Sequence, residues 1–413
     1  MSIKTKLATL LSGNILGQAI PLAALPLLAR LYTPTQFGEF ALLVAICSLL
    51  SLASAARYDV AVISAAKEDK QPLAKLALFT IFTTSSVVFL VVAALYFLNL
   101  INLINALLIF LGVVGVALFN LSNNLHNDKE HYRAITLNMT ARPLSWVIIC
   151  VLGTLDFNAL SQSYGLQAAF VGSYWLVVLL NSQQLIAVFK PNYSGVRLRQ
   201  LAISYRHFAL FNTPHAMLSS ANLNTPSFLL SGFGHVAILG AYSQANKILV
   251  TPWQLIGNAL FKIYYKLAAD KHTQSAPILP VFKRFLSLYT VVLIPIFLTG
   301  FAISETFFVL LLGEDWRIAG QIGALLLPWI FARAIGGMLA FIPLVLNLQR
   351  PALYFEIAYA SCMALTLFMG LQTGNVLASL MWFAWVGAGI VMLQILWLLS
   401  KVKQHDNALL QMP

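Results

Sequence analysis

The most constraining feature of this sequence is a series of apolar runs, each about as long as a membrane is thick. A helix needs about 20 mostly apolar residues to cross a bilayer, and runs of this kind recur from residue 7 to residue 399. The chain is 60% hydrophobic and 9% charged, whereas soluble domains are about 25% charged. A water-soluble fold could not bury this much apolar surface. The sequence therefore predicts a multi-pass membrane protein.

We predict about twelve transmembrane helices, because about twelve runs approach the length that a bilayer requires. The connections between them are short and leave no room for a soluble domain. The expected spans are 7–30, 38–63, 76–98, 104–123, 135–153, 161–188, 208–231, 237–261, 285–304, 318–346, 352–371 and 376–399.

Lysine and arginine concentrate in every second connection, which predicts that both termini are cytoplasmic. Arg30 and Arg317 lie near the opposite ends of the spans, beside several acidic residues. The formal net charge of +12 is thus explained by topology and by contact with anionic lipid. We expect membrane lipids, and not nucleic acid, as partners. The cytoplasmic basic residues are Lys4, Lys6, Lys67, Lys70, Lys75, Lys129, Arg133, Lys190, Arg197, Arg199, Arg206, Lys262, Lys266, Lys271, Lys283, Arg284, Arg350, Lys401 and Lys403.

A short internal repeat indicates that the chain is duplicated. Residues 28–31 lead to 37–40 with the same spacing with which 230–233 lead to 239–242. A parallel repeat of this kind has a symmetry axis along the membrane normal. We therefore predict an all-α membrane protein of two six-helix bundles related by a pseudo-two-fold axis along the membrane normal. The predicted domains are an N-terminal bundle (1–190), a basic cytoplasmic linker (191–207), a C-terminal bundle (208–400) and a cytoplasmic tail (401–413).

The stretch from Pro26 to Ile63 combines two apolar runs, a polar corner and an embedded charged triplet. We expect Pro34 to stop the first helix, and Thr33, Pro34 and Gly38 to form a turn. This stretch resembles the Wzx-type polysaccharide-transport flippases of the multidrug/oligosaccharidyl-lipid/polysaccharide exporter superfamily. The matching segments are Arg30-Leu31-Tyr32-Thr33-Pro34, Phe37-Gly38-Glu39-Phe40 and Arg57-Tyr58-Asp59. A weaker likeness covers nearly the whole chain.

Four cations remain inside the predicted spans after the connections are counted: Arg57, Arg142, Lys247 and Arg333. A charged side chain within a span costs about 2.5–3.5 kcal/mol on insertion scales, so it faces a partner or a wet cavity. We predict a hydrated cavity that accepts an anionic ligand. A structural ion pair or snorkelling to the headgroups is the alternative for each arginine, above all for Arg57 with Asp59 or Glu356. These two carboxylates are also the candidates for ion coupling.

Polar residues on three spans share single helical faces. In the eighth span they are Ser243, Lys247, Thr251, Gln254 and Asn258, whose spacings of three and four place them on one side. Such a stripe predicts a cavity lining, although hydrogen bonds between helices are an alternative. The first span carries Asn14 and Gln18, and the seventh carries Asn222. We include Gln254, Asn258, Asn14, Gln18 and Asn222 among the substrate-binding candidates.

We find no catalytic arrangement in the short loops and no phosphate-binding loop for ATP. Cys47, Cys150 and Cys362 lie in apolar runs without metal-ligand spacing. We therefore expect no enzyme activity, no metal and no cofactor. A membrane polymerase or ligase would need a large catalytic loop, which makes this alternative the weakest.

The resemblance implies the function. It implies a flippase in the bacterial inner membrane that moves a polyprenyl-pyrophosphate-linked oligosaccharide, such as an O-antigen unit of lipopolysaccharide biosynthesis, by alternating access through a cationic central cavity. Arg142, Lys247 and Arg333 would bind the pyrophosphate, and the prenyl tail would leave between the first and seventh spans. Other membrane proteins of polysaccharide assembly are further expected partners. A multidrug or cation exporter of the same fold is the alternative, although embedded acids are expected there and this chain is rich in embedded cations.

Overall fold

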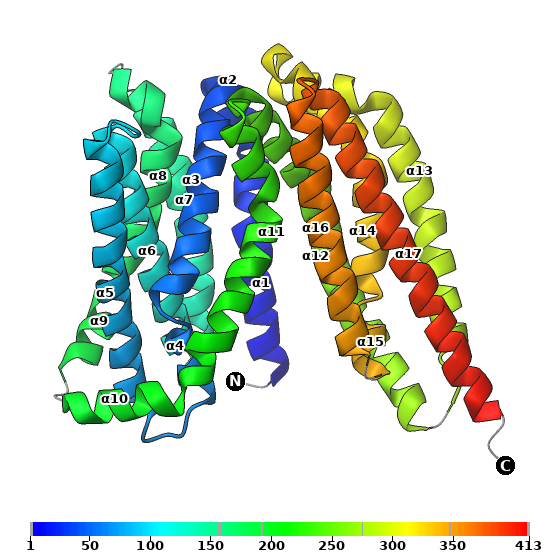
Figure 1. Cartoon of the computed structure of the whole chain (residues 1–413), viewed down its shortest axis with the longest axis horizontal. Helices are drawn as coiled ribbons and strands as arrows, with labels where there is room; N and C mark the ends of the chain where they lie inside the picture. The colour runs from blue at the N-terminus through cyan, green and yellow to red at the C-terminus, as the bar shows by residue number, and fades with distance from the viewer. Residues whose placement is uncertain (1–2, 156–158, 191–192, 275, 347, 411–413) are drawn as a thin grey trace. The chain divides into compact units, whose positions relative to one another are not determined.

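The computed structural model describes residues 3–155, 159–190, 193–274, 276–346 and 348–410, and helices make up nearly all of this part (Figure 1). Contacts divide the chain into two compact units, Met1–Ser231 and Gly232–Pro413. We call them unit 1 and unit 2 and describe each by itself. The boundaries of the four predicted domains stay a prediction.

Unit 1 is a bundle in which α6 packs against α3, α4, α5 and α8, while α1 packs against α7. A π-helical turn, Phe208–Asn212, precedes its last helix. The helices are α1 (Ile3–Ala23), α2 (Leu25–Leu31), α3 (Pro34–Ser54), α4 (Tyr58–Ser64), α5 (Lys70–Phe97), α6 (Leu103–Asp128), α7 (Tyr132–Gly153), α8 (Ala159–Leu180), α9 (Ser182–Phe189), α10 (Gly195–Ser204) and α11 (Thr213–Gly232).

Unit 2 is organised around α14, which packs against α12, α13 and α17. Most side chains of α14 are therefore buried or partly buried. A 3-10 turn, Glu314–Trp316, leads into it. The helices are α12 (Val236–Thr273), α13 (Leu279–Leu312), α14 (Arg317–Met338), α15 (Phe341–Val345), α16 (Gln349–Gln372) and α17 (Val376–Leu410).

Ten helical segments among the described residues are long and apolar enough to cross a membrane. They confirm an all-helical, multi-pass membrane protein. The π-helical turn and α11 together cover the predicted span 208–231, and α12 covers 237–261. The count of twelve spans, the pseudo-two-fold symmetry and the cytoplasmic termini stay predictions. The ten segments are Ser12–Leu31, Pro34–Ser54, Lys70–Phe97, Leu103–Asp128, Tyr132–Gly153, Ser163–Leu180, Leu293–Leu312, Glu314–Val345, Arg350–Gln372 and Val376–Leu409.

The corner at residues 32–39 forms differently from our expectation. Helix α2 ends at Leu31, and Pro34 is the first residue of α3 instead of the stop of the first helix. Thr33 caps α3: its hydroxyl accepts a hydrogen bond from the Gln36 N–H, and the Gln36 side chain accepts one from the Thr33 N–H. Proline suits a first helical position because its missing N–H has no partner there. The capping box therefore starts the helix and draws the predicted turn residue Gly38 into it.

The predicted span 38–63 is wrong in one respect, because the helix breaks inside it. Helix α3 ends at Ser54 and α4 begins at Tyr58. Between them Ala56 and Arg57 have φ angles of 45° and 57°, in the left-handed region that costs most residues energy. Tertiary contacts beyond the break hold the chain in this path: the Tyr58 hydroxyl donates to the Ala202 carbonyl.

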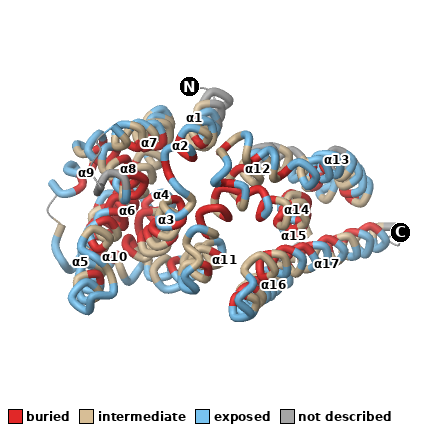
Figure 2. The backbone as a smooth tube through the Cα atoms, turned by 90° about the horizontal axis from the view of Figure 1, so that it is seen from above, coloured by how far each residue is buried: buried red, intermediate tan, exposed pale blue. Residues whose placement is uncertain are grey.

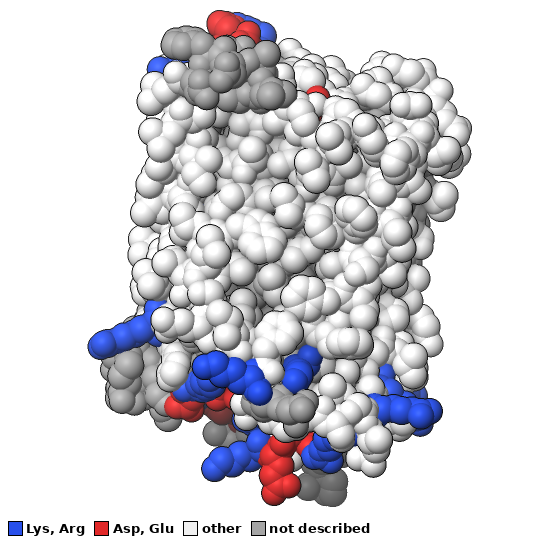
Figure 3. Space-filling view, turned by 90° about the vertical axis from the view of Figure 1, so that its left-hand side faces the viewer, with Lys and Arg blue, Asp and Glu red and all other residues white. Residues whose placement is uncertain are grey.

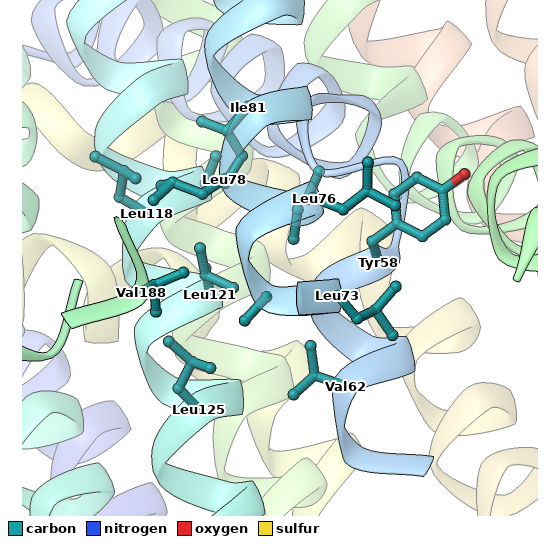
Figure 4. Close-up of a cluster of buried hydrophobic side chains, with 14 of the residues drawn as sticks. Tyr58, Val62, Leu73, Leu76, Leu78, Ile81, Leu118, Leu121, Leu125 and Val188 are labelled. Atoms are coloured by element: carbon teal, nitrogen blue, oxygen red, sulfur yellow. The ribbon is translucent and has the colours of Figure 1, made fainter. Parts of the chain in front are cut away.

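Apolar side chains of six helices form the main core of unit 1 (Figure 4). Leu73, Leu78 and Ile81 of α5 meet Leu121 of α6, and all four are at most 1% exposed. Val188 of α9 closes one side of this cluster. Buried residues gather between α3, α4, α6 and α8 in Figure 2, so the rim of the bundle is left to face lipid.

The basic segment between the predicted bundles is structured. Helix α10 lies across the ends of the α4 and α5 helices (Figure 1), and its Leu201 is 2% exposed in the unit 1 core. Arg197 pairs with Asp69, which also accepts a hydrogen bond from the Tyr205 hydroxyl. In Figure 3 charged side chains gather at this end, below a broad band without charge. The prediction that this basic end faces the cytoplasm stays a prediction.

Candidate functional site

A cavity of about 350 Å³ opens between α12 and α14 in unit 2. This volume lies in the range of small-molecule pockets, about 300–1,000 Å³. Among the described residues that line it, Arg333 alone is charged. We call it the polar pocket; its lining residues are Val250, Trp253, Gln254, Gly257, Phe261, Trp329, Ile330, Arg333, Ala334, Gly337 and Met338.

Arg333 is exposed in this pocket, and its position is fixed by an aromatic ring. Its guanidinium carbon lies 5.1 Å from the centre of the Trp329 ring. Trp329 precedes Arg333 by one helical turn, which brings the two side chains together. A cation over an indole face is stabilised by about 0.5–2 kcal/mol. Stacking occupies the face of the guanidinium and leaves its N–H groups available, so the group can bind a phosphate oxygen.

Trp329 is itself held by two neighbouring helices. Its indole N–H donates to the Tyr359 hydroxyl of α16 at 2.7 Å. Its ring also makes an edge contact with Phe383 of α17, with centroids 5.3 Å apart. Because the indole has little freedom, Arg333 is presented to the pocket in a restricted position. This order lowers the conformational entropy that anion binding would cost.

The structure brings together some residues of the predicted α12 stripe and not others. Gln254 lines the polar pocket with Arg333. Lys247 is partly buried on the same helix, two turns from Gln254 and outside the pocket lining. Ser243 bonds within its own helix, to the Gly240 carbonyl. The side chain of Asn258 lies outside the described residues. Of the residues of the stripe, Gln254 therefore lines the pocket, whereas Ser243 makes a hydrogen bond within its own helix.

In unit 1, Arg142 of α7 resembles Arg333 in its surroundings. Its guanidinium carbon lies 5.0 Å from the centre of the Tyr174 ring on α8. Asn14 and Gln18 are joined by a hydrogen bond of 3.1 Å on α1, as their shared face predicts, and α1 packs against α7. Asn222 is partly buried on α11. These four residues belong to unit 1, so their convergence with Arg333 and Lys247 on one cavity stays a prediction.

Arg57 and Asp59 lie together at the break between α3 and α4. Asp59 is 4% exposed and accepts a hydrogen bond from Asn124 at 2.8 Å. Its second oxygen, Oδ1, and the Arg57 Nε are buried without a hydrogen-bond partner among the described residues. This site lies between the candidate spans Pro34–Ser54 and Lys70–Phe97. Burial raises the pKa of the Asp59 carboxyl, and the charge of Arg57 opposes this shift. Glu356, by contrast, is exposed on α16 of unit 2.

Three aromatic residues of the polar pocket were not among the predicted site residues: Trp253, Phe261 and Trp329. Trp329 could have been found, because it precedes Arg333 by four residues and so shares its face. Trp253 is next to Gln254 in the sequence, but neighbouring residues of a helix lie on different faces. The polar-face pattern that selects Gln254 therefore leaves Trp253 out. Among the described residues, no group of three or more His, Cys, Asp or Glu side chains could hold a metal ion.

The apolar helices define a multi-pass membrane protein, and unit 2 contains a pocket with a stacked cation. The chain matches the model of the polysaccharide biosynthesis protein family over residues 27–320. It therefore belongs to this family, which confirms the resemblance drawn from residues 26–63. A comparison with curated proteins finds no match.

Solved structures show which fold the chain has. The lipid II flippase MurJ in an inward closed conformation aligns with a TM-score of 0.68 at 11% identity, covering 99% of this chain and 90% of MurJ. A point mutant of the Vibrio cholerae MATE transporter VcmN aligns with a TM-score of 0.57 at 14% identity, covering 98% and 97%. The chain therefore has the fold that MurJ and VcmN share. These structural relatives are a flippase and a transporter.

Proposed function

We propose that this protein is a flippase for a polyprenyl-pyrophosphate-linked oligosaccharide of O-antigen or another surface polysaccharide. It would act in the bacterial inner membrane by alternating access. The observation that carries the proposal is Arg333, an exposed cation stacked on Trp329 in a pocket between membrane helices. A charge with no counter-ion among the described residues is costly in such a place unless water or an anion accompanies it. The pyrophosphate of a lipid-linked sugar supplies that anion.

Each proposed binding residue has a role set by its chemistry. Arg333, Arg142 and Lys247 are the proposed pyrophosphate partners, and Arg57 is a further candidate. Arg142 and Arg333 are each held over an aromatic ring, which orients a guanidinium for bidentate contact with phosphate. The amides are the proposed sugar partners, since they offer both donors and acceptors to hydroxyl groups; they are Gln254, Asn258, Asn14, Gln18 and Asn222.

The test is transport in the host organism. The gene would be deleted, and labelled lipid-linked oligosaccharide would be measured on each side of the inner membrane. Cells should accumulate it on the cytoplasmic side, and the wild-type gene should restore the outer pool. Arg333→Gln should lower the rate roughly tenfold to a hundredfold, since a hydrogen bond to a charged group contributes about 1.5–3 kcal/mol.

Two matched variants control for charge and folding. Arg333→Lys keeps the charge and loses the planar fork, so it should retain an intermediate rate. Lys403→Gln removes an equal charge from an exposed position outside the pocket and should transport normally. A normal rate for Arg333→Gln would remove the pyrophosphate role. A normal outer pool in the deletion strain would argue against the flippase as a whole.

The second candidate function is a multidrug or cation exporter. The fold permits it, but the described lining of the polar pocket carries a cation and no carboxylate. A cationic drug in the polar pocket would be repelled by the positive charge of Arg333, because like charges repel strongly in a low dielectric. New drug sensitivity in the deletion strain, together with a normal outer pool of lipid-linked sugar, would favour the exporter.

For the coupling ion we propose Asp59 over Glu356. Asp59 is buried with one carboxylate oxygen unpartnered in the described structure, whereas Glu356 is exposed. A buried carboxylate changes its charge with its surroundings more readily than an exposed one. Asp59→Asn should abolish any dependence of transport on an imposed proton or sodium gradient, and Glu356→Gln should preserve it.

A further inference from the structure

A second cavity of unit 2, of about 430 Å³, shares the residue Trp253 of α12 with the polar pocket. Its described lining has no charged residue. We call it the apolar groove; its residues are Leu249, Trp253, Pro295, Ile296, Phe297, Thr299, Gly300, Ile303, Ser304, Phe307, Phe308 and Leu327. The groove lies in unit 2 alone, between α12, α13 and α14.

Two residues of α13 in the groove lining have little or no side chain to fill it or to bond there. Pro295 lies inside the helix, where proline has no backbone N–H to donate. Gly300 has no side chain, and a Cβ added there would lie 3.7 Å from a methyl group of Leu327. A longer side chain at residue 300 would therefore fill the space between α13 and α14. Ile303 is 49% exposed at the groove and leaves it open to the surroundings.

Trp253 is the wall that the apolar groove and the polar pocket share. On the groove side its ring stacks on Phe297, with centroids 5.7 Å apart and planes at 27°. On the other side Trp253 and its neighbour Gln254 line the pocket that holds Arg333. The polar pocket with its cation and the apolar groove thus adjoin at the side chain of Trp253. Together they match an amphiphile with an anionic head and a long apolar chain.

We propose that the apolar groove holds the isoprenoid chain of the substrate while its pyrophosphate meets Arg333. This inference rests on the proposed function and adds a path for the lipid part. The path differs from the gap between the first and seventh spans that the sequence suggested. In the predicted topology the groove lies toward the outer end of α13, so it guides the chain in the outer leaflet.

The groove contributes position more than affinity. Lipid tails are as apolar as leucine, so moving the chain from bilayer to protein releases little hydrophobic free energy. Contacts with Phe297 and Phe307 add dispersion energy of about 0.1–0.2 kcal/mol per atom pair. The charge of Arg333 holds the head, and the groove decides where the chain runs. Removal of the Arg333 charge or filling of the apolar groove should therefore change which residues the isoprenoid chain contacts.

Photo-crosslinking of the full-length protein in nanodiscs tests this path. Benzoylphenylalanine would replace Ile303 in the groove or Leu310, which is 78% exposed on the same helix and outside the groove lining. The probe is radiolabelled undecaprenyl pyrophosphate in bilayers of phosphatidylethanolamine and phosphatidylglycerol. We expect at least fivefold more labelling from position 303 than from 310, and a drop of roughly tenfold on adding Arg333→Gln. Equal labelling at both positions would overturn the proposal.

Competition distinguishes the substrate from ordinary lipid. Labelling at position 303 should persist when phosphatidylglycerol is raised, because a diphosphate binds the cation more strongly than a monoanionic diester. Labelling that phosphatidylglycerol removes, or that survives Arg333→Gln unchanged, would identify a site for bulk lipid and refute the proposal.

Filling the groove provides a second measurement. Gly300→Leu should lose most labelling at position 303 and most transport. The matched control is Gly389→Leu, because Gly389 on α17 is exposed with nothing within 4 Å of an added Cβ. Gly300→Ala makes only an ordinary contact with Leu327 and should be intermediate. If the wild-type protein and Gly300→Leu both transport normally, the role of the groove is refuted and the proposed function stands. If the wild-type protein moves no lipid-linked sugar, the proposed function itself is refuted.

Discussion

At the scale of single residues, the orientation of Arg333 depends on its contact with Trp329, which is held in turn by a hydrogen bond to Tyr359. The Tyr359 hydroxyl accepts the indole N–H of Trp329, and the guanidinium lies over that indole. Three helices therefore cooperate to place one cation. The sequence contains the first link, since Trp329 and Arg333 are one turn apart, but the hydroxyl comes from α16, thirty residues away.

Replacing Tyr359 by Phe tests this support. The change removes the acceptor and leaves the Trp329 N–H without its partner, at a cost of about 1 kcal/mol. We expect the KM for lipid-linked sugar to rise roughly fivefold with little change in the amount of folded protein. Tyr354→Phe is the control, because Tyr354 is on the same helix and 72% exposed. An unchanged KM in Tyr359→Phe would show that the ring needs no such anchor.

A second residue-scale feature is a buried amide network in unit 1. Asn138 of α7 donates to Asn123 of α6 and accepts from Asn181, each at 2.9 Å. Asn181 also meets His126 Nε2 at 2.7 Å. Asn138 is 3% exposed, so its partners have little access to water. Asn138 lies four residues before Arg142 in the sequence, and the tertiary structure uses it to join helices.

The Asn138→Leu variant should therefore lose stability rather than substrate affinity. It removes one hydrogen-bond partner from Asn123 and one from Asn181. Loss of a partner costs a buried polar group about 1–3 kcal/mol, although hydrogen bonds in membranes average about 0.6 kcal/mol. We expect a fall in the midpoint of thermal unfolding of several degrees in detergent, with normal KM in the remaining folded protein. Ser86→Leu, on an exposed face of α5, should leave the midpoint unchanged.

At the scale of elements, one side chain near the end of the chain caps a distant helix. Asp406 of α17 is 5% exposed. Its two oxygens accept the N–H groups of Ile278 and Leu279 at the start of α13, at 3.0 and 2.7 Å. The positive end of the helix dipole favours a carboxylate there. His405 continues the contact to His272 of α12, with ring nitrogens 3.1 Å apart.

Removing this cap should loosen the start of α13. In Asp406→Ala the amides of Ile278 and Leu279 lose a charged acceptor, each bond being worth about 1.5–3 kcal/mol. Hydrogen exchange should speed up at these amides by tenfold or more, and exchange in α14 should stay slow. Asp270→Ala removes an exposed acid from α12 and is expected to change neither. Equal exchange in both variants would contradict the capping role.

At the scale of the whole molecule, the charge pattern predicts the orientation of the chain in the membrane. A fluorescent protein fused after residue 413 should fluoresce, because the C-terminus is expected in the cytoplasm. Cysteines placed at the exposed residues Lys67 and Glu314 should react with an impermeant maleimide from opposite sides. Labelling of both from the same side would require an even number of spans between them and would overturn the twelve-span topology, which has seven.

The sequence determined the class of the protein by itself. Length, hydropathy and charge distribution act locally, so runs of apolar residues show the membrane helices without any tertiary information. The polysaccharide family followed from residues 26–63 for the same reason, because the motif is contiguous. Shared faces such as that of Asn14 and Gln18 also follow from helical periodicity alone.

Tertiary contacts decided the rest. The break at Ala56 and Arg57 has left-handed angles that no local pattern requires, and Tyr58 and Asp59 are held by Ala202 and Asn124 from distant helices. The polar pocket needs the packing of α12 against α14 to join Gln254 with Arg333. Cavities and helix breaks are set by side chains that meet across long sequence separations, and their free energies exceed the local preferences that a sequence displays.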